Sequence, residues 1–398
     1  MVTIADRIAR LGTETAFAVS NEANTFAAQG NKVYPFHLGD LNLATPSTVV
    51  EGSWKALQEG KTGYCPNAGI PQLREALAAD VSASHRVEYG PENVAAQPGG
   101  KPTIGKFILA LMNPGDEVLY PNPGYPIYES QIEFNGGIAV PYGYVEGEDN
   151  FGLDFDSIER GITSKTRLLI LNDLQNPTGA ECFPGEHERL ADLVRRHDLY
   201  VLTDEAYFDM RYEGTSRSFV EQPGMAERTV ILYTFSKKFA MTGWRLGASI
   251  GPKPIIDVIA KINVNDESCS NHFIQYGAVA GLAGDQTEVK AILATLQERR
   301  DVLAEGLNSI AGVRTYVPNA TFYLYPNVTE AMANLGMGDY EEFRRAVLHN
   351  TGVSFTSRLH FGRAQPAESE KYVRFAYSGI DTDEINEGLA KLKAFLES

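Results

Sequence analysis

The chain has 398 residues, 43% of them hydrophobic, and a formal net charge of −16, which is typical of a globular protein with two or three domains or one large domain with an appendage. The acidic excess disfavours general binding to nucleic acid or to anionic membranes. The three scattered cysteines predict no disulfide framework or thiolate metal site, and no run resembles a signal peptide or membrane helix, so we expect a cytoplasmic protein without a metal.

Between about residues 46 and 285, short apolar runs alternate with amphipathic segments of helix length. The runs of strand length are 117–120, 167–171, 199–202 and 229–233. Their order predicts a mainly parallel sheet with helices on both faces. One of these helices is predicted at HERLADLVRRHD, where the spacing places four side chains on one face: Leu190, Leu193, Val194 and His197.

From about residue 290 the pattern predicts a smaller α+β domain. Its expected elements are a helix at LQERRDVLAEGL, a strand at TFYLYP, a helix at EEFRRAVL, a strand at VRFAY and a final helix. Asp381 and Glu384 have the spacing of a capping box at the start of that last helix.

The N-terminal segment is expected to pack against another part of the protein. Ile4, Ile8 and Leu11 share one helical face, which predicts packing on the smaller domain or on another subunit. We therefore divide the chain into an N-terminal arm that forms part of the small domain (1–45), a large domain (46–288) and a small C-terminal domain (289–398).

Polar residues follow several of the predicted strands. The glycine pair before Lys101 lets backbone N–H groups approach an anion at a helix start, which suits a phosphate, although a plain helix-entry turn is an alternative. In NDLQNPTG, Asn176 offers a donor and an acceptor at the carboxyl end of a parallel strand, where ligands of such sheets bind. An ordinary Asn-Pro turn is the alternative there.

Two further segments carry charged groups. In LYVLTDEAYFDM, an apolar strand runs into Asp204, with Tyr207 three residues later; a solvated turn, or a metal pair with Glu205, is an alternative. In TFSKKFAMTGWRLG, Lys237 is followed by a second lysine, and that neighbouring cation lowers the pKa of an amine that attacks an aldehyde. Arg245 can then clamp an anion; the alternative is a solvated dibasic turn.

Together these groups match the four parts of pyridoxal phosphate. A pyridinium nitrogen needs an anionic partner, a phenolate oxygen needs neutral donors, a phosphate needs N–H groups and an arginine, and an aldehyde needs an amine. The sequence places such groups in order at the ends of successive predicted strands.

Nearly the whole chain resembles the class I and II aminotransferases of pyridoxal-phosphate fold type I, the group that contains aspartate aminotransferase. The segments that carry the resemblance are LGDLNLATP, TGYCPNAGIPQLREAL, the GGK turn, PNPGYPIY, NPTG, DEAY, SKKFAMTGWRLG and YVRFAYS. The resemblance implies an α/β fold in which helices sandwich the sheet of a large cofactor-binding domain, a smaller α+β domain, and a homodimer with shared active sites.

The resemblance also implies roles for individual residues. Lys237 is expected to form the Schiff base with the cofactor and to act as general acid and base. Asp204 is expected to bind the pyridinium nitrogen, and Tyr207 and Asn176 are expected to donate to the phenolate oxygen. The variable position Lys238 is expected to be electrostatic or structural.

Other residues are expected to complete the cofactor site. Tyr125 resembles the aromatic residue that stacks on the cofactor ring, and Tyr64 resembles the tyrosine that reaches the phosphate of the neighbouring subunit. The expected phosphate contacts are Gly100, Lys101, Ser236, Arg245 and, as a weaker candidate, Thr234.

For the substrate, Arg374 resembles the residue that grips the α-carboxylate through a bidentate pair, and Gly39 resembles a backbone contact to the same group. Asn176 is also expected to contact substrate.

The chain departs from the family pattern at Leu174 and Gln175, where a proline commonly precedes the Asn-Asn-Pro turn, and at Ser357–Arg358 in TSRLHFG. Arg358, His360 and Arg363 are candidates to influence substrate choice, and solvated loop charges are the alternative.

We therefore expect an aminotransferase that moves an amino group between an L-amino acid and a 2-oxo acid. Aspartate with 2-oxoglutarate is the first choice, and aromatic or other biosynthetic substrates come next. One alternative is a lyase that eliminates a β- or γ-substituent on the same fold. Another is a pyridoxal-phosphate-binding regulator, but such proteins usually carry a further DNA-binding domain, and the family segments begin here by about residue 38.

Overall fold

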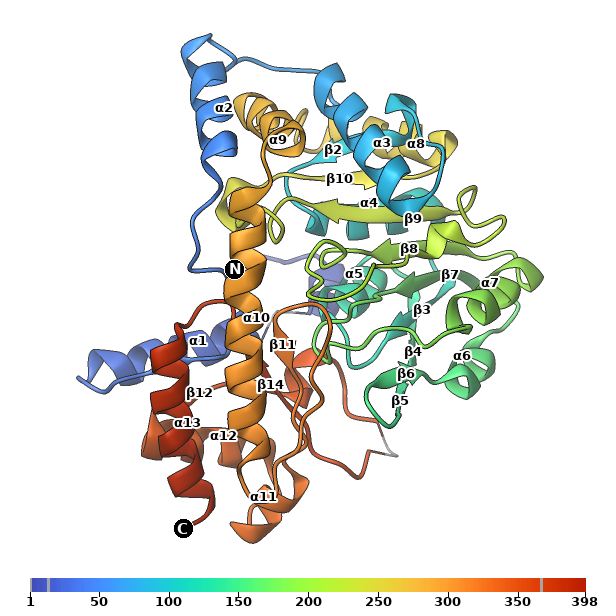
Figure 1. Cartoon of the computed structure of the whole chain (residues 1–398). Helices are drawn as coiled ribbons and strands as arrows, with labels where there is room; N and C mark the ends of the chain where they lie inside the picture. The colour runs from blue at the N-terminus through green and yellow to red at the C-terminus, as the bar shows by residue number, and fades with distance from the viewer. Residues whose placement is uncertain (1, 13–14, 366–367) are drawn as a thin grey trace.

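The computed structural model describes residues 2–12, 15–365 and 368–398. Its centre is a sheet in the order β2-β10-β9-β8-β7-β3-β4 (Figure 1). The strands are β2 (Val94–Gln97), β3 (Glu117–Pro121), β4 (Ile138–Tyr142), β7 (Thr166–Leu171), β8 (Tyr200–Asp204), β9 (Thr229–Thr234) and β10 (Gly247–Ile250). Strand β10 pairs antiparallel with both β2 and β9, and the other neighbouring strands of this sheet pair parallel. The predicted mainly parallel sheet and the four predicted strand positions are confirmed.

Helices cover both faces of this sheet, and β7 shows why its sequence is apolar throughout. Leu168 and Ile170 face a core with helices α4 (Lys101–Leu111), α5 (Ile127–Phe134) and α8 (Lys253–Asn265). Leu169 and Leu171 face the opposite core with α6 (Phe155–Gly161) and α7 (Glu186–Arg196). Because successive side chains of a strand point to opposite faces, a strand buried on both sides needs an apolar residue at each position.

Near the β2 end of the sheet, α2 (Ser47–Gln58) lies beside α9 (His272–Ala283). Helices α9 and α3 (Pro71–His85) share a core with β9 and β10. A short hairpin, β5 (Tyr144–Glu146) and β6 (Phe151–Leu153), lies near the opposite end (Figure 1).

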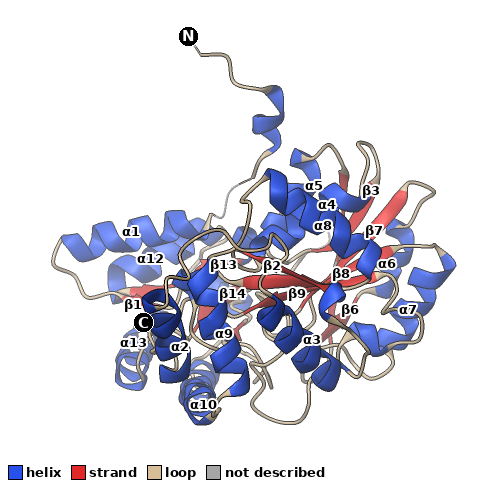
Figure 2. Cartoon of the chain, turned by 90° about the horizontal axis from the view of Figure 1, so that it is seen from above, coloured by secondary structure: helices blue, strands red, loops and turns tan. Residues whose placement is uncertain are grey.

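The C-terminal part forms a second layer of helices and short strands (Figure 2). Its elements are α10 (Thr287–Asn308), β11 (Tyr323–Leu324), α11 (Thr329–Asn334), α12 (Tyr340–Thr351), β12 (Val353–Ser354), β13 (Thr356–Ser357), β14 (Val373–Ala376) and α13 (Thr382–Leu396). From the N-terminal part, α1 (Ala16–Ala28) lies near α12. Strand β1 (Tyr34–Pro35) pairs with β12, and Tyr34 and Phe36 share the core of α10, α12 and α13. The boundaries at residues 46 and 289 stay predictions.

Two local predictions are wrong. His197 does not join the buried face of α7, because the helix ends at Arg196 and the histidine is exposed at its C-terminal cap. Asp381 precedes α13, but its side chain makes no capping hydrogen bond. Its Oδ1 instead accepts from Arg299, 2.7 Å away, and from Asn42, 3.1 Å away, because the buried guanidinium requires an anionic partner.

The N-terminal segment packs differently from one of the expected arrangements. Residues 6–10 form a 3₁₀ helix next to α5, and the backbone N–H of Gly12 donates to Ser130 Oγ at 2.9 Å. The segment therefore does not lie on the C-terminal layer, and Ile4, Ile8 and Leu11 are exposed. Packing of these side chains on a second subunit stays a prediction.

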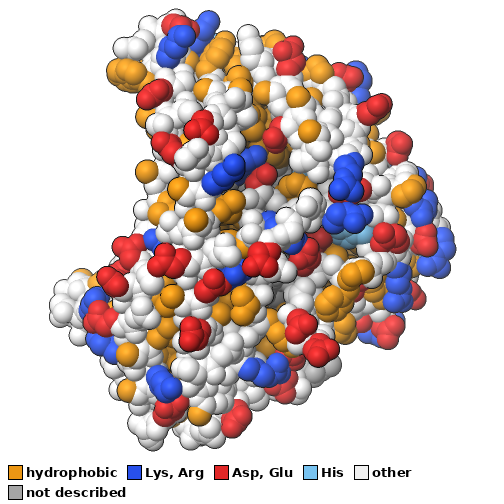
Figure 3. Space-filling model, in the orientation of Figure 1, with side chains coloured by type: hydrophobic (Ala, Val, Ile, Leu, Met, Phe, Trp, Pro, Cys, Tyr) orange, Lys and Arg blue, Asp and Glu red, His pale blue; other side chains and the backbone are white. Residues whose placement is uncertain are grey.

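The surface is mixed in character. Acidic and basic side chains are interspersed over the face drawn in Figure 3, with hydrophobic side chains scattered between them. Within the described ranges, no helix is both long enough and apolar enough to span a membrane.

Candidate active site

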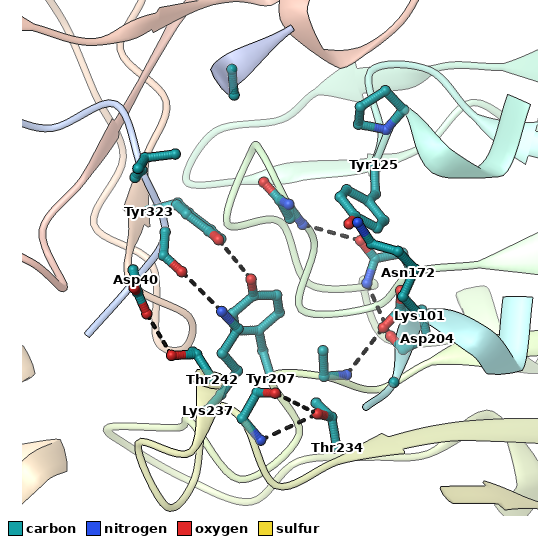
Figure 4. Close-up of a pocket in the computed structure, with 18 of the residues that line it drawn as sticks. Asp40, Lys101, Tyr125, Asn172, Asp204, Tyr207, Thr234, Lys237, Thr242 and Tyr323 are labelled. Atoms are coloured by element: carbon teal, nitrogen blue, oxygen red, sulfur yellow. Dashed lines mark hydrogen bonds between the residues drawn. The ribbon is translucent and has the colours of Figure 1, made fainter. Parts of the chain in front are cut away.

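A cavity of about 520 Å³ lies at the carboxyl end of β7, β8 and β9. Every expected site residue except Tyr64 lines it: Gly39, Gly100, Lys101, Tyr125, Asn176, Asp204, Tyr207, Ser236, Lys237, Arg245 and Arg374. Parallel strands end at the same edge of a sheet, so residues far apart in sequence meet there (Figure 4). Tyr64 lies outside the cavity of its own chain and is 89% exposed.

Asp204 is a buried carboxylate at the end of β8. It is only 6% exposed, and its Oδ2 accepts from the hydroxyl of Tyr128 at 2.6 Å while its Oδ1 accepts from the N–H of Ala206 at 3.2 Å. Burial raises the pKa of Asp204 to about 6, although both hydrogen bonds oppose this rise. Such a carboxylate is suited to a cationic ligand, because a positive charge would relieve the cost of ionising it here.

Lys237 and Tyr207 lie on the other side of the cavity (Figure 4). The ammonium of Lys237 donates to the carbonyl oxygen of Gly39 at 2.9 Å. The hydroxyl of Tyr207 forms a 2.6 Å hydrogen bond with that of Tyr323. Gly39 approaches Tyr323 so closely that a Cβ at this position would lie 2.2 Å from the tyrosine oxygen. Glycine is therefore required for this arrangement of Lys237 and Tyr323.

Arg374 lies in β14 and is buried, so the alternative of a surface arginine is wrong. Its guanidinium donates to Asn176 Oδ1 at 2.9 Å and to the carbonyl of His37 at 2.8 Å. The guanidinium carbon lies 4.4 Å from the ring centre of Tyr323 and 4.6 Å from that of Phe361. These contacts fix the orientation of a cation that can bind a carboxylate.

The turn before Asn176 is held by its own polar groups. The backbone N–H of Asn176 donates to Asn172 Oδ1 at 3.1 Å, and Asn172 Nδ2 donates to the carbonyl of Asp204 at 2.9 Å. Leu174 adopts a left-handed conformation with φ 54°, and Gln175 donates to the carbonyl of Pro123 at 2.7 Å. The departures from the family pattern thus coincide with a turn that still directs Asn176 into the cavity.

An anion-binding corner is formed where α4 begins. Gly100 is the N-cap residue, and the first N–H groups of a helix have no partner within the helix. Gly99 has φ 98°, and a Cβ there would lie 2.3 Å from Arg245 Nη2, so the glycine admits the guanidinium. The hydroxyl groups of Thr234 and Ser236 lie 2.9 Å apart in the same cavity.

Aromatic side chains from the start of α5 form the wall above Asp204. The ring centres of Tyr125 and Tyr128 lie 5.8 Å apart in an edge-to-face arrangement. The ammonium of Lys101 lies 5.5 Å from the ring centre of Tyr125. Lys101 was predicted as a phosphate contact, and it lines the cavity.

Of the three residues considered for substrate choice, one lines the cavity and two do not. His360 lines the cavity, and its Nδ1 lies 2.8 Å from Ser357 Oγ. Arg358 and Arg363 do not line it: Arg358 pairs with Glu368, and Arg363 pairs with the carboxylates of α5.

Lys238 and Glu205, which follow Lys237 and Asp204 in sequence, contact charged side chains outside the cavity lining. Lys238 Nζ lies 3.3 Å from Asp209 and 3.9 Å from Asp80. Glu205 does not form a metal pair with Asp204, because its carboxylate lies 2.6 Å from His85 Nε2 and accepts from Ser218. The contacts with Asp80 and His85 join segments more than 100 residues apart, which a reading along the chain does not reveal.

Sequence reasoning missed several lining residues, among them Tyr128, Asn172 and Tyr323. A signal was available for Tyr128, which follows Tyr125 by only three residues: Tyr125 precedes α5 and Tyr128 lies in its first turn. Tyr323 was expected only as part of a strand.

The lining fits pyridoxal phosphate. Asp204 provides a buried acid for a ring nitrogen, Lys237 provides an amine for the aldehyde, and Arg245 with the start of α4 provides an anion site. The glycine at position 99, where a Cβ would collide with Arg245, keeps that anion site open.

Comparison with known proteins agrees with this geometry. The sequence model of the family described as "Aminotransferase class I and II" matches residues 32–392. The aspartate aminotransferase of Musicola paradisiaca is 31% identical, over 100% of this chain and 99% of that protein. The structure of Thermus thermophilus aspartate aminotransferase with maleate is 29% identical with a TM-score of 0.90, covering 99% of this chain and 100% of that one.

A third relative carries a different substrate name. The structure of the aromatic aminotransferase from Pyrococcus horikoshii is 31% identical with a TM-score of 0.86, covering 94% of this chain and 98% of that one. The names therefore differ in substrate but agree in reaction. The chain belongs to the class I and II aminotransferase family, whose members use pyridoxal phosphate.

Proposed function

We propose that this aminotransferase uses a dicarboxylic amino acid, with aspartate as first choice, and a dicarboxylic 2-oxo acid such as 2-oxoglutarate. The observation that carries the proposal is the set of cations in the cavity: Lys101, Lys237, Arg245 and Arg374. Lys237 is assigned to the cofactor aldehyde, Arg245 to the phosphate and Arg374 to the substrate α-carboxylate. Lys101 also lines the cavity, and we assign its ammonium to a second carboxylate of the substrate. A dicarboxylic substrate agrees with two of the relatives' names.

The protein groups would perform the reaction as follows. When bound, pyridoxal phosphate supplies an aldehyde that receives the amino group and a ring that withdraws electrons from the substrate Cα–H bond. Arg374 orients the substrate through its α-carboxylate, and Asn176 is held beside it. Lys237 Nζ removes the proton from Cα and returns a proton in the second part of the transfer. Asp204 keeps a positive charge on the ring nitrogen.

A donor screen tests the proposed substrates. The purified holoenzyme is mixed with single amino acids, and the loss of the aldehyde absorbance is followed. We expect aspartate and glutamate to convert the cofactor in stoichiometric amount without release of ammonia, whereas elimination by a lyase would release ammonia and retain the aldehyde. Faster conversion by aromatic amino acids would favour the aromatic alternative.

Replacing Lys101 by methionine tests the role of its charge. We expect kcat/KM for aspartate to fall by about 10- to 100-fold, because a hydrogen bond to a charged group contributes about 1.5–3 kcal/mol. For alanine, which has no second carboxylate, we expect a change of less than about threefold. Steady-state kinetics with both donors provides the measurement, and equal losses would show that Lys101 does not distinguish them.

We also propose a homodimer with shared active sites. The support is Tyr64, which is 89% exposed and outside the cavity of its own chain, although the family resemblance assigns it to a cofactor phosphate. Light scattering after gel filtration is expected to give about twice the chain mass of 43.6 kDa. A fully active monomer would contradict the proposal.

A further inference from the structure

Outside the cavity, three side chains with metal-binding atoms converge between β7 and α7. They are Asp173, Cys182 and His187. Asp173 is the second residue after β7, Cys182 lies in the loop that follows, and His187 lies in the first turn of α7. One ligand atom from each lies within 4.8 Å of the others. Asp173 and His187 are largely shielded from solvent, with side chains 11% and 8% exposed, so the cluster is not a solvated surface group.

The contact between the histidine and the carboxylate does not have the geometry of a hydrogen bond. His187 Nε2 lies 2.9 Å from Asp173 Oδ2, yet this buried nitrogen makes no hydrogen bond to any residue that the structure describes. His187 as a whole is 7% exposed. The contact is short but does not satisfy Nε2 as an aligned hydrogen bond would, and a shared cation would satisfy both groups.

The carboxylate of Asp173 is already oriented for such a point. Its Oδ1 accepts from the backbone N–H groups of Leu174 at 3.0 Å and Cys182 at 2.9 Å. These bonds fix the carboxylate with Oδ2 toward the histidine. Hydrogen bonds of this kind orient the ligands in protein metal sites.

The electrostatics of the cluster favour a cation. A bound divalent cation stabilises the thiolate form of a cysteine ligand directly. One carboxylate, one thiolate and one neutral imidazole together carry a charge of −2, which balances a divalent ion.

We propose that Asp173, Cys182 and His187 bind a zinc ion. Sulfur, nitrogen and oxygen donors in one site favour Zn²⁺ over Mg²⁺ or Ca²⁺, which prefer oxygen ligands. An adjoining cavity of about 10 Å³, lined by Asp173, Cys182 and Tyr144, has about the size for one water molecule as a fourth ligand. This proposal replaces the sequence-based expectation that the cysteines form no thiolate metal site and that no metal is bound.

The ion would be structural. It lies next to the turn that positions Asn172 and Asn176, and it would join the start of that turn to the first turn of α7. Because none of its three ligands lines the catalytic cavity, the ion has no direct contact with the reacting groups.

The test measures metal binding rather than activity. Purified holoenzyme is dialysed against metal-free buffer, titrated with Zn²⁺ or Co²⁺ and analysed by mass spectrometry for metals and by visible absorption. We expect about one ion per chain, and with Co²⁺ the strong d–d bands of a four-coordinate site, at wavelengths longer than those of the cofactor. Cys182→Ala and His187→Asn are expected to weaken binding by at least about tenfold.

Cys269→Ala is the matched control, since it removes a thiol elsewhere in the chain and should retain the ion and its spectrum. Absence of four-coordinate Co²⁺ bands in the unchanged protein would overturn the proposal without any variant. Equal binding by the unchanged protein and by Cys182→Ala would overturn it as well. Because these readouts do not depend on turnover, they are independent of the proposed substrates.

Discussion

The Lys237→Ala variant is expected to lose at least about 10⁴-fold in kcat while keeping its fold, because one amine performs two tasks. Its Nζ is assigned both to the covalent bond with the cofactor aldehyde and to the transfer of the substrate Cα proton. The side chain lies partly open to the cavity, where Nζ donates to the Gly39 carbonyl, so its removal leaves no cavity inside a packed core. Single-turnover absorbance and steady-state kinetics measure the loss.

Lys238→Ala is the matched control for this variant. Its ammonium is adjacent in sequence but pairs with Asp209 and Asp80 rather than lining the cavity. We expect it to retain activity within about tenfold of the unchanged enzyme. Borohydride reduction followed by peptide mapping is expected to locate the cofactor on Lys237; a label on Lys238, or substantial turnover by Lys237→Ala, would contradict the assignment.

The central sheet was predictable because its strands are buried on both faces. Because both faces of β7 and β9 are buried, their sequences are continuous apolar runs, which differ from the mixed polar and apolar sequence of an amphipathic surface helix. The short strands of the C-terminal layer were less well defined: of the predicted TFYLYP strand, only Tyr323–Leu324 pairs as a strand. The aromatic residues of this segment pack in the core or line the cavity. Their spacing along the chain therefore reflects packing more than the pairing of strands.

Site residues were predictable where they lie at the carboxyl ends of neighbouring parallel strands, because these ends meet at one edge of the sheet. Asn176 and Asp204 follow neighbouring parallel strands, and Lys237 follows the next one. Contacts made across the fold were not predictable. Asp381 binds Arg299 instead of capping α13, and the carboxylate of Glu205 contacts His85. A buried ionic group needs a partner that is close in space, and that partner need not be close in sequence.

Asp204→Asn is expected to lower kcat by about 10²- to 10³-fold, which is typical for removal of one preorganised electrostatic partner of the reacting system. Asparagine keeps the size of the side chain and an oxygen that can accept from Tyr128 or Ala206, so the change isolates the charge. Steady-state kinetics measures the loss. In the control Tyr128→Phe, the carboxylate remains and only its 2.6 Å hydrogen bond is removed, so we expect a loss of no more than about tenfold.

The Asp204→Asn substitution is also expected to stabilise the protein once the cofactor has been removed. Burial raises the pKa of Asp204 from 3.8 to about 6, so the folded state binds a proton more tightly than the unfolded state does. Ionisation therefore destabilises the fold progressively as the pH rises from about 4 to 6, and the full penalty, up to about 3 kcal/mol, is present above pH 6.

Urea unfolding of the cofactor-free protein at several pH values tests this opposition between stability and function. Above pH 6, Asp204→Asn should be the more stable protein, and below about pH 4 the difference should disappear because the carboxyl is then protonated in both states. With the cofactor bound, the positive ring nitrogen supplies the missing partner charge, so the advantage of the variant should shrink or reverse. A stability gain that is the same at every pH would contradict the raised pKa of Asp204. A gain that persists unchanged with the cofactor bound would mean that Asp204 is not the partner of that nitrogen.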